Sequence, residues 1–498
     1  MTSPASTRLA GGIALVLALA GCSLAPEYRR PDAPVAAAWP DGPAYRGGPR
    51  DAAGPAAADI GWREFFADPV LRQLIGTALA NNRDLRVAAL NVEAARAQYR
   101  IQRSELLPAI GAGANASLQR TPGDLSASGR ATTSHSYSVG LGVTAFELDL
   151  FGRLRSLRDQ ALESYFAQQE TRSAVQLSLV AETANAYLSL RAHQQLLDLT
   201  RQTLDSQRES YDLTRQSFEN DLATALDLSQ AEIALRTAER DLEVYSRMAA
   251  QDLNAVQQLA GGPLPDELAA ALQAPGELAD ASLPADPPAG LPSDLLARRP
   301  DVRAAEHDLK AANANIGAAR AAFFPSISLT GSAGTASSSL SGLFKAGSGA
   351  WSFVPQITLP IFSGGANLAN LDLAETQQRI QVARYEQAIQ AAFREVADGL
   401  AARATLARQV QAQQALEAAA QRAYRLAEQR YRQGVDNYLS VLVAQRDWVD
   451  ARQALVETRL ARLGNLATLY KALGGGWTET APAAASGPPA QVAEAPAR

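Results

Sequence analysis

The sequence predicts a mainly α-helical chain with an internal duplication, in which four β-strands contribute to a transmembrane barrel that several chains share. Three observations support this fold class. The chain contains two copies of one unit, and each copy carries two stretches in which apolar residues alternate with small or polar ones. Each copy then continues into a helical run of about 65 residues.

The duplication is visible as two blocks of matching residues. Residues 82–110 align with residues 299–327 at a constant offset of 217. A second block aligns at an offset of 213 and matches Gly261 with Gly474. Self-similarity of this kind indicates a repeated structural unit. We therefore expect one repeat over residues 75–262 and another over residues 292–475.

Four segments lie outside the repeats, and their compositions differ from that of the helices. We expect residues 1–21 to be a signal peptide and residues 22–74 an extended N-terminal segment. The linker 263–291 is rich in proline and alanine, and the tail 476–498 is expected to be disordered.

The N-terminus predicts export and lipid attachment. The apolar run from Leu9 to Ala20 is too short to span a bilayer and is typical of a signal peptide. Cys22, the only cysteine, follows small residues as in a bacterial lipobox, so we expect acyl chains on Cys22. The alternative is an inert cysteine near an ordinary cleavage site. Ser23 at the next position favours the outer membrane over the inner one.

The expected strands raise the question of how a sheet could close. They cover residues 107–119, 136–148, 325–335 and 351–362, with one apolar and one small or polar face. A half-buried soluble sheet would fit this pattern, but the lipobox favours a lipid-facing barrel. Closed barrels need about 8 strands, and an open edge in lipid leaves backbone groups unpaired. The barrel must therefore be shared, by two chains or by three, and only three leave room for a water-filled lumen.

The long helical runs predict rods. Residues 153–218 contain no proline or glycine, and residues 366–433 contain only Gly399. Apolar residues recur at spacings of three and four, as in a coiled coil. The breaks at 217–232 and 430–445 are expected to be helix-hairpin turns, with Gly434 as a C-cap.

Catalytic and metal sites are not expected, and neither is a cofactor. His135, His193 and His307 are scattered, and none has a partner at metal-ligand spacing. Glu147 and Asp149 lie close together, but carboxylates at a strand end are more often bonded to basic neighbours. The net charge is −5 with both signs interspersed, which argues against a nucleic-acid partner.

The chain resembles the TolC-like outer-membrane factors, in particular the lipoprotein branch of the resistance-nodulation-division (RND) multidrug efflux channels. The resemblance rests on motifs in both repeats, in the order that the family shows. They are the lipobox, FELDLFGRLRSL (146–157), ATALDLSQAE (223–232), RRPDVRAAE (298–306), LPIFSGG (359–365) and GVDNYLSVLVAQR (434–446).

This resemblance implies a homotrimer with a 12-stranded β-barrel in the outer membrane and a 12-helix α-barrel in the periplasm. It implies a passive exit duct that receives small molecules from an inner-membrane RND transporter through a periplasmic adaptor protein. Two alternatives remain open, a type I protein-secretion channel and a periplasmic coiled-coil lipoprotein without a pore.

The resemblance also assigns site residues. Leu439 would narrow the periplasmic gate, together with Val443, Ser440 and Asp227. Many relatives carry an aspartate where this chain has Val443, so we expect a more apolar entrance. The tips that meet the adaptor would contain Gly434, Val435, Asp221 and Leu222. The junction between the two barrels would contain Phe151, Gly152, Phe362 and Gly364. In RRPDVRAAE, Arg299, Asp301, Arg303 and Glu306 are interpreted as a helix start with salt bridges.

Overall fold

The computed structural model describes residues 23–46, 56–127, 129–274, 276, 278, 292 and 294–477. The expected signal peptide, Cys22, most of the expected linker and all but the first two residues of the expected tail lie outside these residues. The described chain forms two compact units. Unit 1 contains residues up to 32, 90–169 and 304–387, and unit 2 contains 33–89, 170–303 and 388 onward.

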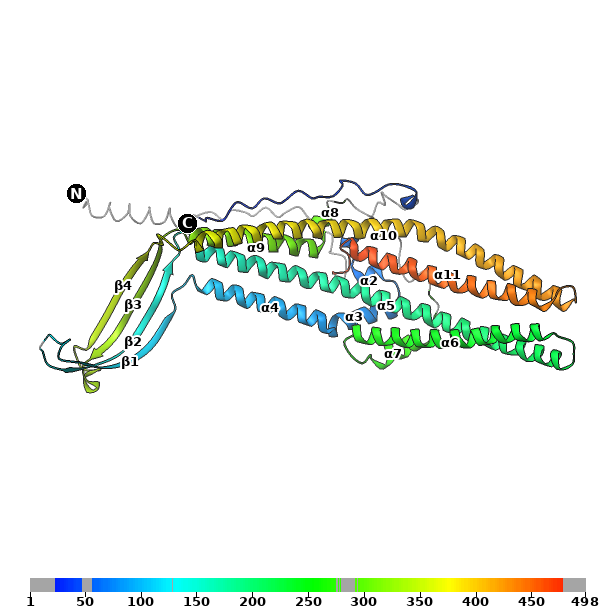
Figure 1. The fold of residues 1–498 in the computed structure, drawn as a ribbon, viewed down its shortest axis with the longest axis horizontal. Helices are drawn as coiled ribbons and strands as arrows, with labels where there is room; N and C mark the ends of the chain where they lie inside the picture. The colour runs from blue at the N-terminus through cyan, green and yellow to red at the C-terminus, as the bar shows by residue number, and fades with distance from the viewer. Residues whose placement is uncertain are drawn as a thin grey trace, which may run out of the picture. The chain divides into compact units, whose positions relative to one another are not determined.

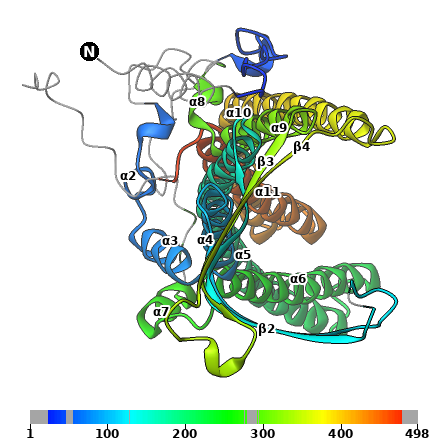
Figure 2. The same cartoon turned by 90° about the vertical axis from the view of Figure 1, so that its left-hand side faces the viewer.

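Unit 1 contains a four-stranded antiparallel sheet of order β1-β2-β3-β4, seen as a curved band in Figure 2. Its strands are β1 (Ile110–Thr121), β2 (Thr132–Leu148), β3 (Ser326–Ser337) and β4 (Gly349–Thr358). Because the order follows the chain, β1 and β4 are the edges, and neither has a second partner among the described residues. The sequence predicted that strand β4 ends at residue 362. It ends at Thr358, two residues before Pro360, which has no N–H to donate to the ladder.

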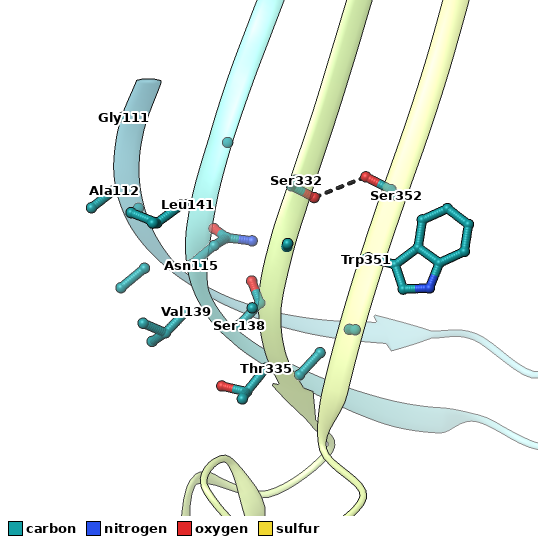
Figure 3. Close-up of a pocket in the computed structure, with 18 of the residues that line it drawn as sticks. Gly111, Ala112, Asn115, Ser138, Val139, Leu141, Ser332, Thr335, Trp351 and Ser352 are labelled. Carbon is teal, nitrogen blue, oxygen red and sulfur yellow. Dashed lines mark hydrogen bonds between the residues drawn. The ribbon is translucent and has the colours of Figure 1, made fainter. Parts of the chain in front are cut away.

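The register gives the sheet two chemically different faces. Residues directly opposite each other share a face. Ala112, Leu141, Ala333 and Trp351 therefore lie on one face, and Gly142, Ser332 and Ser352 on the other. Ser332 and Ser352 are hydrogen-bonded across β3 and β4 at 2.8 Å (Figure 3). The strands curve around a hollow of about 770 Å³ lined by residues of all four.

A β-bulge keeps the apolar residues of β2 on one face. The pairing with β3 shifts between Val143 and Phe146, where Ala145 has φ +51°. Its N–H donates to the Thr330 hydroxyl at 3.1 Å. One extra residue reverses the alternation. Phe146 thus remains on the side of Val143, whereas the sequence pattern predicted strict alternation through Ala145.

The two repeats produce helices of equal length. The long helices are α5 (Arg153–Glu219) and α10 (Ala366–Arg432), each of 67 residues. Their partners α6 (Ala225–Leu259) and α11 (Tyr438–Ala472) each have 35 residues. Figure 1 shows that each long helix turns back into its partner at a hairpin. None of the helices among the described residues is long and apolar enough to cross a membrane.

Shorter helices replace parts of the expected extended segments. The structure contains α2 (Trp62–Phe65), α3 (Pro69–Asn81) and α7 (Asp266–Gln273) there. Asp68 caps α3 by accepting the Val70 N–H at 2.8 Å, and acidic residues in the first turn favour α7. The helices α4 (Arg83–Ser104), α8 (Asp294–Arg298) and α9 (Pro300–Ala321) complete the fold.

The core of unit 2 is built around an aromatic cluster. Phe65 stacks on Tyr470 with ring centroids 3.9 Å apart, and Phe66 meets both rings edge-on. Arg191 donates to the backbone oxygens of Ala271 and Ala274 at 2.8 Å, which caps the C-terminal end of α7. Helix α7 packs beside α3 (Figure 2). These contacts bring the residues before the first repeat into the core of the unit.

The first described residues, 23–46, form an extended segment that we call the N-terminal strap (dark blue in Figure 1). Within unit 1, Arg30 binds the carboxylate of Glu306 on α9 at 2.7 Å, and Asn313 donates to Pro26 O at 2.8 Å. At Gly317 an added Cβ would lie 2.7 Å from the Ala25 nitrogen, so the close approach requires glycine. In the first repeat, α4 carries Arg100 at the position of Gly317.

A second part of the N-terminal strap lies within unit 2. There Trp39 stacks on Phe393 of α10 with ring centroids 5.0 Å apart. Arg408, further along α10, donates to the backbone oxygen of Arg46 at 2.6 Å. The strap is thus bound to the second repeat in both units.

Candidate functional site

The hairpins that join the long helices are built alike in the two repeats. We call residues 217–227 the first tip and residues 430–440 the second tip. In the first tip, the Leu222 N–H donates to Ser217 O at 2.8 Å, and the Asp221 N–H donates to Phe218 O at 3.0 Å. This is the Schellman arrangement, which needs a left-handed residue after the helix. Asp221 supplies it with φ +59°.

The second tip repeats the arrangement with glycine. The Val435 N–H donates to Arg430 O at 2.9 Å, and the Gly434 N–H donates to Tyr431 O at 2.9 Å. Gly434 has φ +71°, and an added Cβ would meet no atom within 4 Å. The expected C-cap is therefore confirmed. The four residues that the sequence assigned to adaptor contact occupy equivalent places in the two tips, and Leu222 and Val435 are exposed.

The helices that leave the tips are capped by side chains. Thr224 accepts the Asp227 N–H at 3.2 Å, and Asp227 accepts the Thr224 N–H at 2.9 Å, which completes a capping box. The Thr224 hydroxyl, which donates to the Asp227 carboxylate at 2.6 Å, and the Thr224 N–H lower the pKa of Asp227. Asn437 accepts the Ser440 N–H at 3.2 Å in the second tip. Asp227 and Ser440 therefore both act at a helix start in this chain.

The expected gate residues Leu439 and Val443 lie on the first turns of α11 and line a groove. This groove, which we call the tip groove, has a volume of about 330 Å³ and lies between α5, α6 and α11. Ile233 and Leu442 add apolar surface to it, whereas Asp227 and Ser440 do not line it. A second hollow, of about 1080 Å³ between α10 and α11, is lined by Leu439, Ser440 and Val443. Of the four expected gate residues, the structure thus brings three together, and Asp227 is the exception.

Ionisable side chains that the sequence analysis missed line the same groove. Asp241 and Asp450 contribute carboxylates, and Arg446 contributes a guanidinium. Burial raises the pKa of Asp450, the charges of Asp447 and Asp241 raise it further, and Arg446 opposes them. Asp450 could have been found from the sequence, because it lies seven residues, or two helical turns, beyond Val443 and therefore on the same face of the helix.

The junction between sheet and helix differs in the two repeats. Phe151 stacks on Phe324 with ring centroids 4.8 Å apart, and Gly152 turns the chain with φ +75°. Phe362, which was also expected at the junction, is 89% exposed and follows β4, an edge strand of the described sheet. The two phenylalanines thus have different surroundings among the described residues. Gly364 has φ +62°, so a glycine turn does precede α10.

Ion pairs account for the acidic and basic residues near this junction and in the RRPDVRAAE motif. Glu147 pairs with Arg153 at 2.6 Å, and Asp149 pairs with Arg155 at 3.1 Å, as expected for a structural role. Arg299 pairs with Asp301 at 2.6 Å, also as expected. Among the described residues, no cluster of three or more histidine, cysteine, aspartate or glutamate side chains could hold a metal ion.

Comparison with known proteins places these features in a family. The model of the family described as "Outer membrane efflux protein" matches twice, over residues 74–262 and 291–475. The chain is 54% identical over 461 residues to the probable efflux pump outer membrane protein TtgC of Pseudomonas putida, covering 93% of this chain and 94% of the relative. It is 48% identical to the outer membrane protein OprJ of Pseudomonas aeruginosa, covering 93% of this chain and 95% of the relative.

Solved structures agree with the fold. The open state of the MtrE outer membrane channel of Neisseria gonorrhoeae is similar with a TM-score of 0.82 and 42% identity. The match covers 93% of this chain and all of that one. A membrane protein from Pseudomonas aeruginosa is similar with a TM-score of 0.84 and 47% identity, covering 91% of this chain and all of that one.

Proposed function

Because the chain belongs to the outer membrane efflux protein family, we propose that it is the outer-membrane exit duct of an efflux pump, through which small molecules leave passively. The observation that carries this proposal is the two-faced sheet, whose edge strands β1 and β4 have no second partner in the part of the chain that the structure describes. A channel is the activity to which the family points, rather than an enzyme.

We infer that three chains close the barrel. Edge strands in a bilayer need partners, since unpaired backbone groups there cost several kcal/mol each. Pairing of β1 with β4 of a neighbouring chain satisfies both edges without a new element. Three chains of four strands give a 12-stranded barrel with a water-filled interior, and the apolar face of the sheet then meets lipid.

The partners follow from the same role. Relatives carry names such as "Toluene efflux pump outer membrane protein TtgC" and "Antibiotic efflux pump outer membrane protein ArpC". By analogy, we propose that an inner-membrane RND transporter supplies the substrates of this chain through a periplasmic adaptor. These names favour efflux over type I protein secretion. The two-faced sheet disfavours the second alternative, a coiled-coil lipoprotein without a pore.

Individual residues receive proposed roles within this duct. Cys22 carries the lipid anchor, and the exposed Leu222 and Val435 meet the adaptor at the two tips. Leu439 and Val443 narrow the closed entrance. With Val443 in place of the aspartate common in relatives, this entrance selects less strongly for cations.

Two measurements test the proposal. Purified protein in planar bilayers should give discrete channels, and deletion of the gene should increase susceptibility to drugs or solvents. A protein that stays soluble without detergent and forms no channels contradicts the proposal. For the entrance, Val443→Asp should raise cation selectivity and block by multivalent cations, whereas Val443→Ala serves as the size control. Unchanged selectivity in the aspartate variant would exclude the assigned role of position 443.

A further inference from the structure

The tip groove contains a buried polar atom without a partner. Gln207 on α5 lines the groove and is 6% exposed. Its side-chain oxygen accepts no hydrogen bond from any residue that the structure describes. A buried acceptor without a donor is destabilising, so such atoms usually have a water, an ion or a ligand as a partner. The groove therefore lacks a hydrogen-bond donor at this point.

The charges around the groove favour a cation. Asp241 is paired with Arg240 at 2.6 Å, and Arg446 is paired with Asp447 at 2.9 Å. Asp450 forms no ion pair within 4 Å in the described part of the chain, although the charge of Arg446 acts on it. The three carboxylates and two guanidiniums leave one net negative charge. A bound cation would compensate it.

The remaining wall of the groove is apolar. Ile233 of α6 is 66% exposed, and Leu439, Leu442 and Val443 of α11 lie opposite. A volume of about 330 Å³ lies at the lower end of the range for small-molecule pockets. The groove thus combines an apolar wall with a carboxylate and an amide oxygen that have no partner among the described residues.

We propose that the tip groove binds an amphiphilic organic ammonium ion, with its N–H groups directed to Gln207 and Asp450 and its apolar part against Ile233 and Val443. The groove then serves as a cargo-binding site in the wall beside the entrance. Its role in transport rests on the proposed exit duct, whereas binding itself does not.

The test uses a set of probes with one shape and different head groups. Purified full-length protein in detergent is titrated with 2-phenylethylammonium, and binding is followed by saturation-transfer NMR with empty micelles as the blank. The trimethylated analogue keeps the charge but has no N–H donor. The neutral 2-phenylethanol keeps the apolar part alone. We expect the order of affinity to be ammonium, trimethylated analogue and alcohol, from strongest to weakest.

Variants assign the site. Asp450→Asn should weaken binding of the ammonium about fivefold, the effect of losing one partly exposed ion pair. Glu457→Gln is the matched control, because it makes the same charge change on the same helix at a residue outside the groove, and it should leave the affinity unchanged. Gln207→Leu should weaken binding of the ammonium but not of its trimethylated analogue.

The outcomes separate the binding site from the duct. Channels in planar bilayers without ammonium binding would overturn this inference and leave the proposed duct intact. Binding that is equal in Asp450→Asn, Glu457→Gln and unchanged protein would likewise overturn it. Binding without channels would contradict the duct and leave the groove as a binding site.

Discussion

Single substitutions in the two tips should have opposite effects on stability. Each tip needs a left-handed residue after its long helix, and the first repeat uses Asp221 with φ +59°, whereas the second uses Gly434 with φ +71°. Gly434→Ala should therefore destabilise the second tip. Asp221→Gly should stabilise the first. Each tip is the control for the other, because their hydrogen bonds are equivalent.

The size of the effect follows from the surroundings. A Cβ at Gly434 would meet no atom within 4 Å, so the free-energy cost of Gly434→Ala comes from the left-handed backbone conformation and not from a steric clash. The left-handed conformation costs a residue with a Cβ about 1–2 kcal/mol, which corresponds to a roughly 5–30-fold change in a local opening equilibrium. Aspartate adopts this conformation more readily than alanine, so the gain from Asp221→Gly is smaller, about 0.5–1 kcal/mol.

Hydrogen–deuterium exchange resolved to the two tips measures these equilibria directly, because local opening precedes exchange. In Gly434→Ala, amides of the second tip should exchange faster by the stated factor while the first tip is unchanged. In Asp221→Gly, the first tip should exchange more slowly. If alanine at position 434 leaves exchange unaltered, or glycine at position 221 accelerates it, the assignment of both turns as left-handed caps is wrong.

Four further variants or conditions test the fold. Gly317→Ala should displace the N-terminal strap and speed its proteolysis, whereas Arg100→Ala, at the equivalent place in the first repeat, should not. Thr224→Ala removes the capping box and should cost about 1 kcal/mol, seen as faster amide exchange in the first tip. Gly334→Val should reduce the yield of folded protein, because a Cβ there collides with Val139 O. Burial raises the pKa of Glu306, but Arg30 and Lys310 lower it overall, so its contribution to strap binding is present above its ordinary value of 4.5 and is lost as pH falls through the lowered value. Strap proteolysis should rise at that pH, and Glu306→Gln should abolish the dependence.

Local patterns predicted the elements that repeat along the chain. Three of these patterns can be seen in short stretches of sequence: the alternation in the strands, the unbroken helical periodicity from Arg153, and the glycine at position 434. The structure contains the corresponding sheet, helix and C-cap. The resemblance to TolC-like outer-membrane factors also proved correct, because its motifs lie in both repeats and in order.

Contacts between distant residues could not be predicted in the same way. Arg30 and Glu306 are 276 positions apart, and no periodicity connects them. The bulge at Ala145 depends on the Thr330 hydroxyl of the neighbouring strand. The tip groove likewise draws its wall from three helices, so its chemistry emerges only once α5, α6 and α11 are placed together.

The equal lengths of α5 and α10, and of α6 and α11, restrict how such a chain can change in length. Deletion of one residue within a helix moves everything beyond it by 1.5 Å along the axis and turns it by about 100°. The residues of one tip would then face a different direction from those of the other. A tolerated insertion or deletion should therefore come in multiples of seven, and it should occur in both helices of a hairpin and in both repeats. The lengths of the four helices are therefore coupled, and a single insertion or deletion in one of them should not be tolerated.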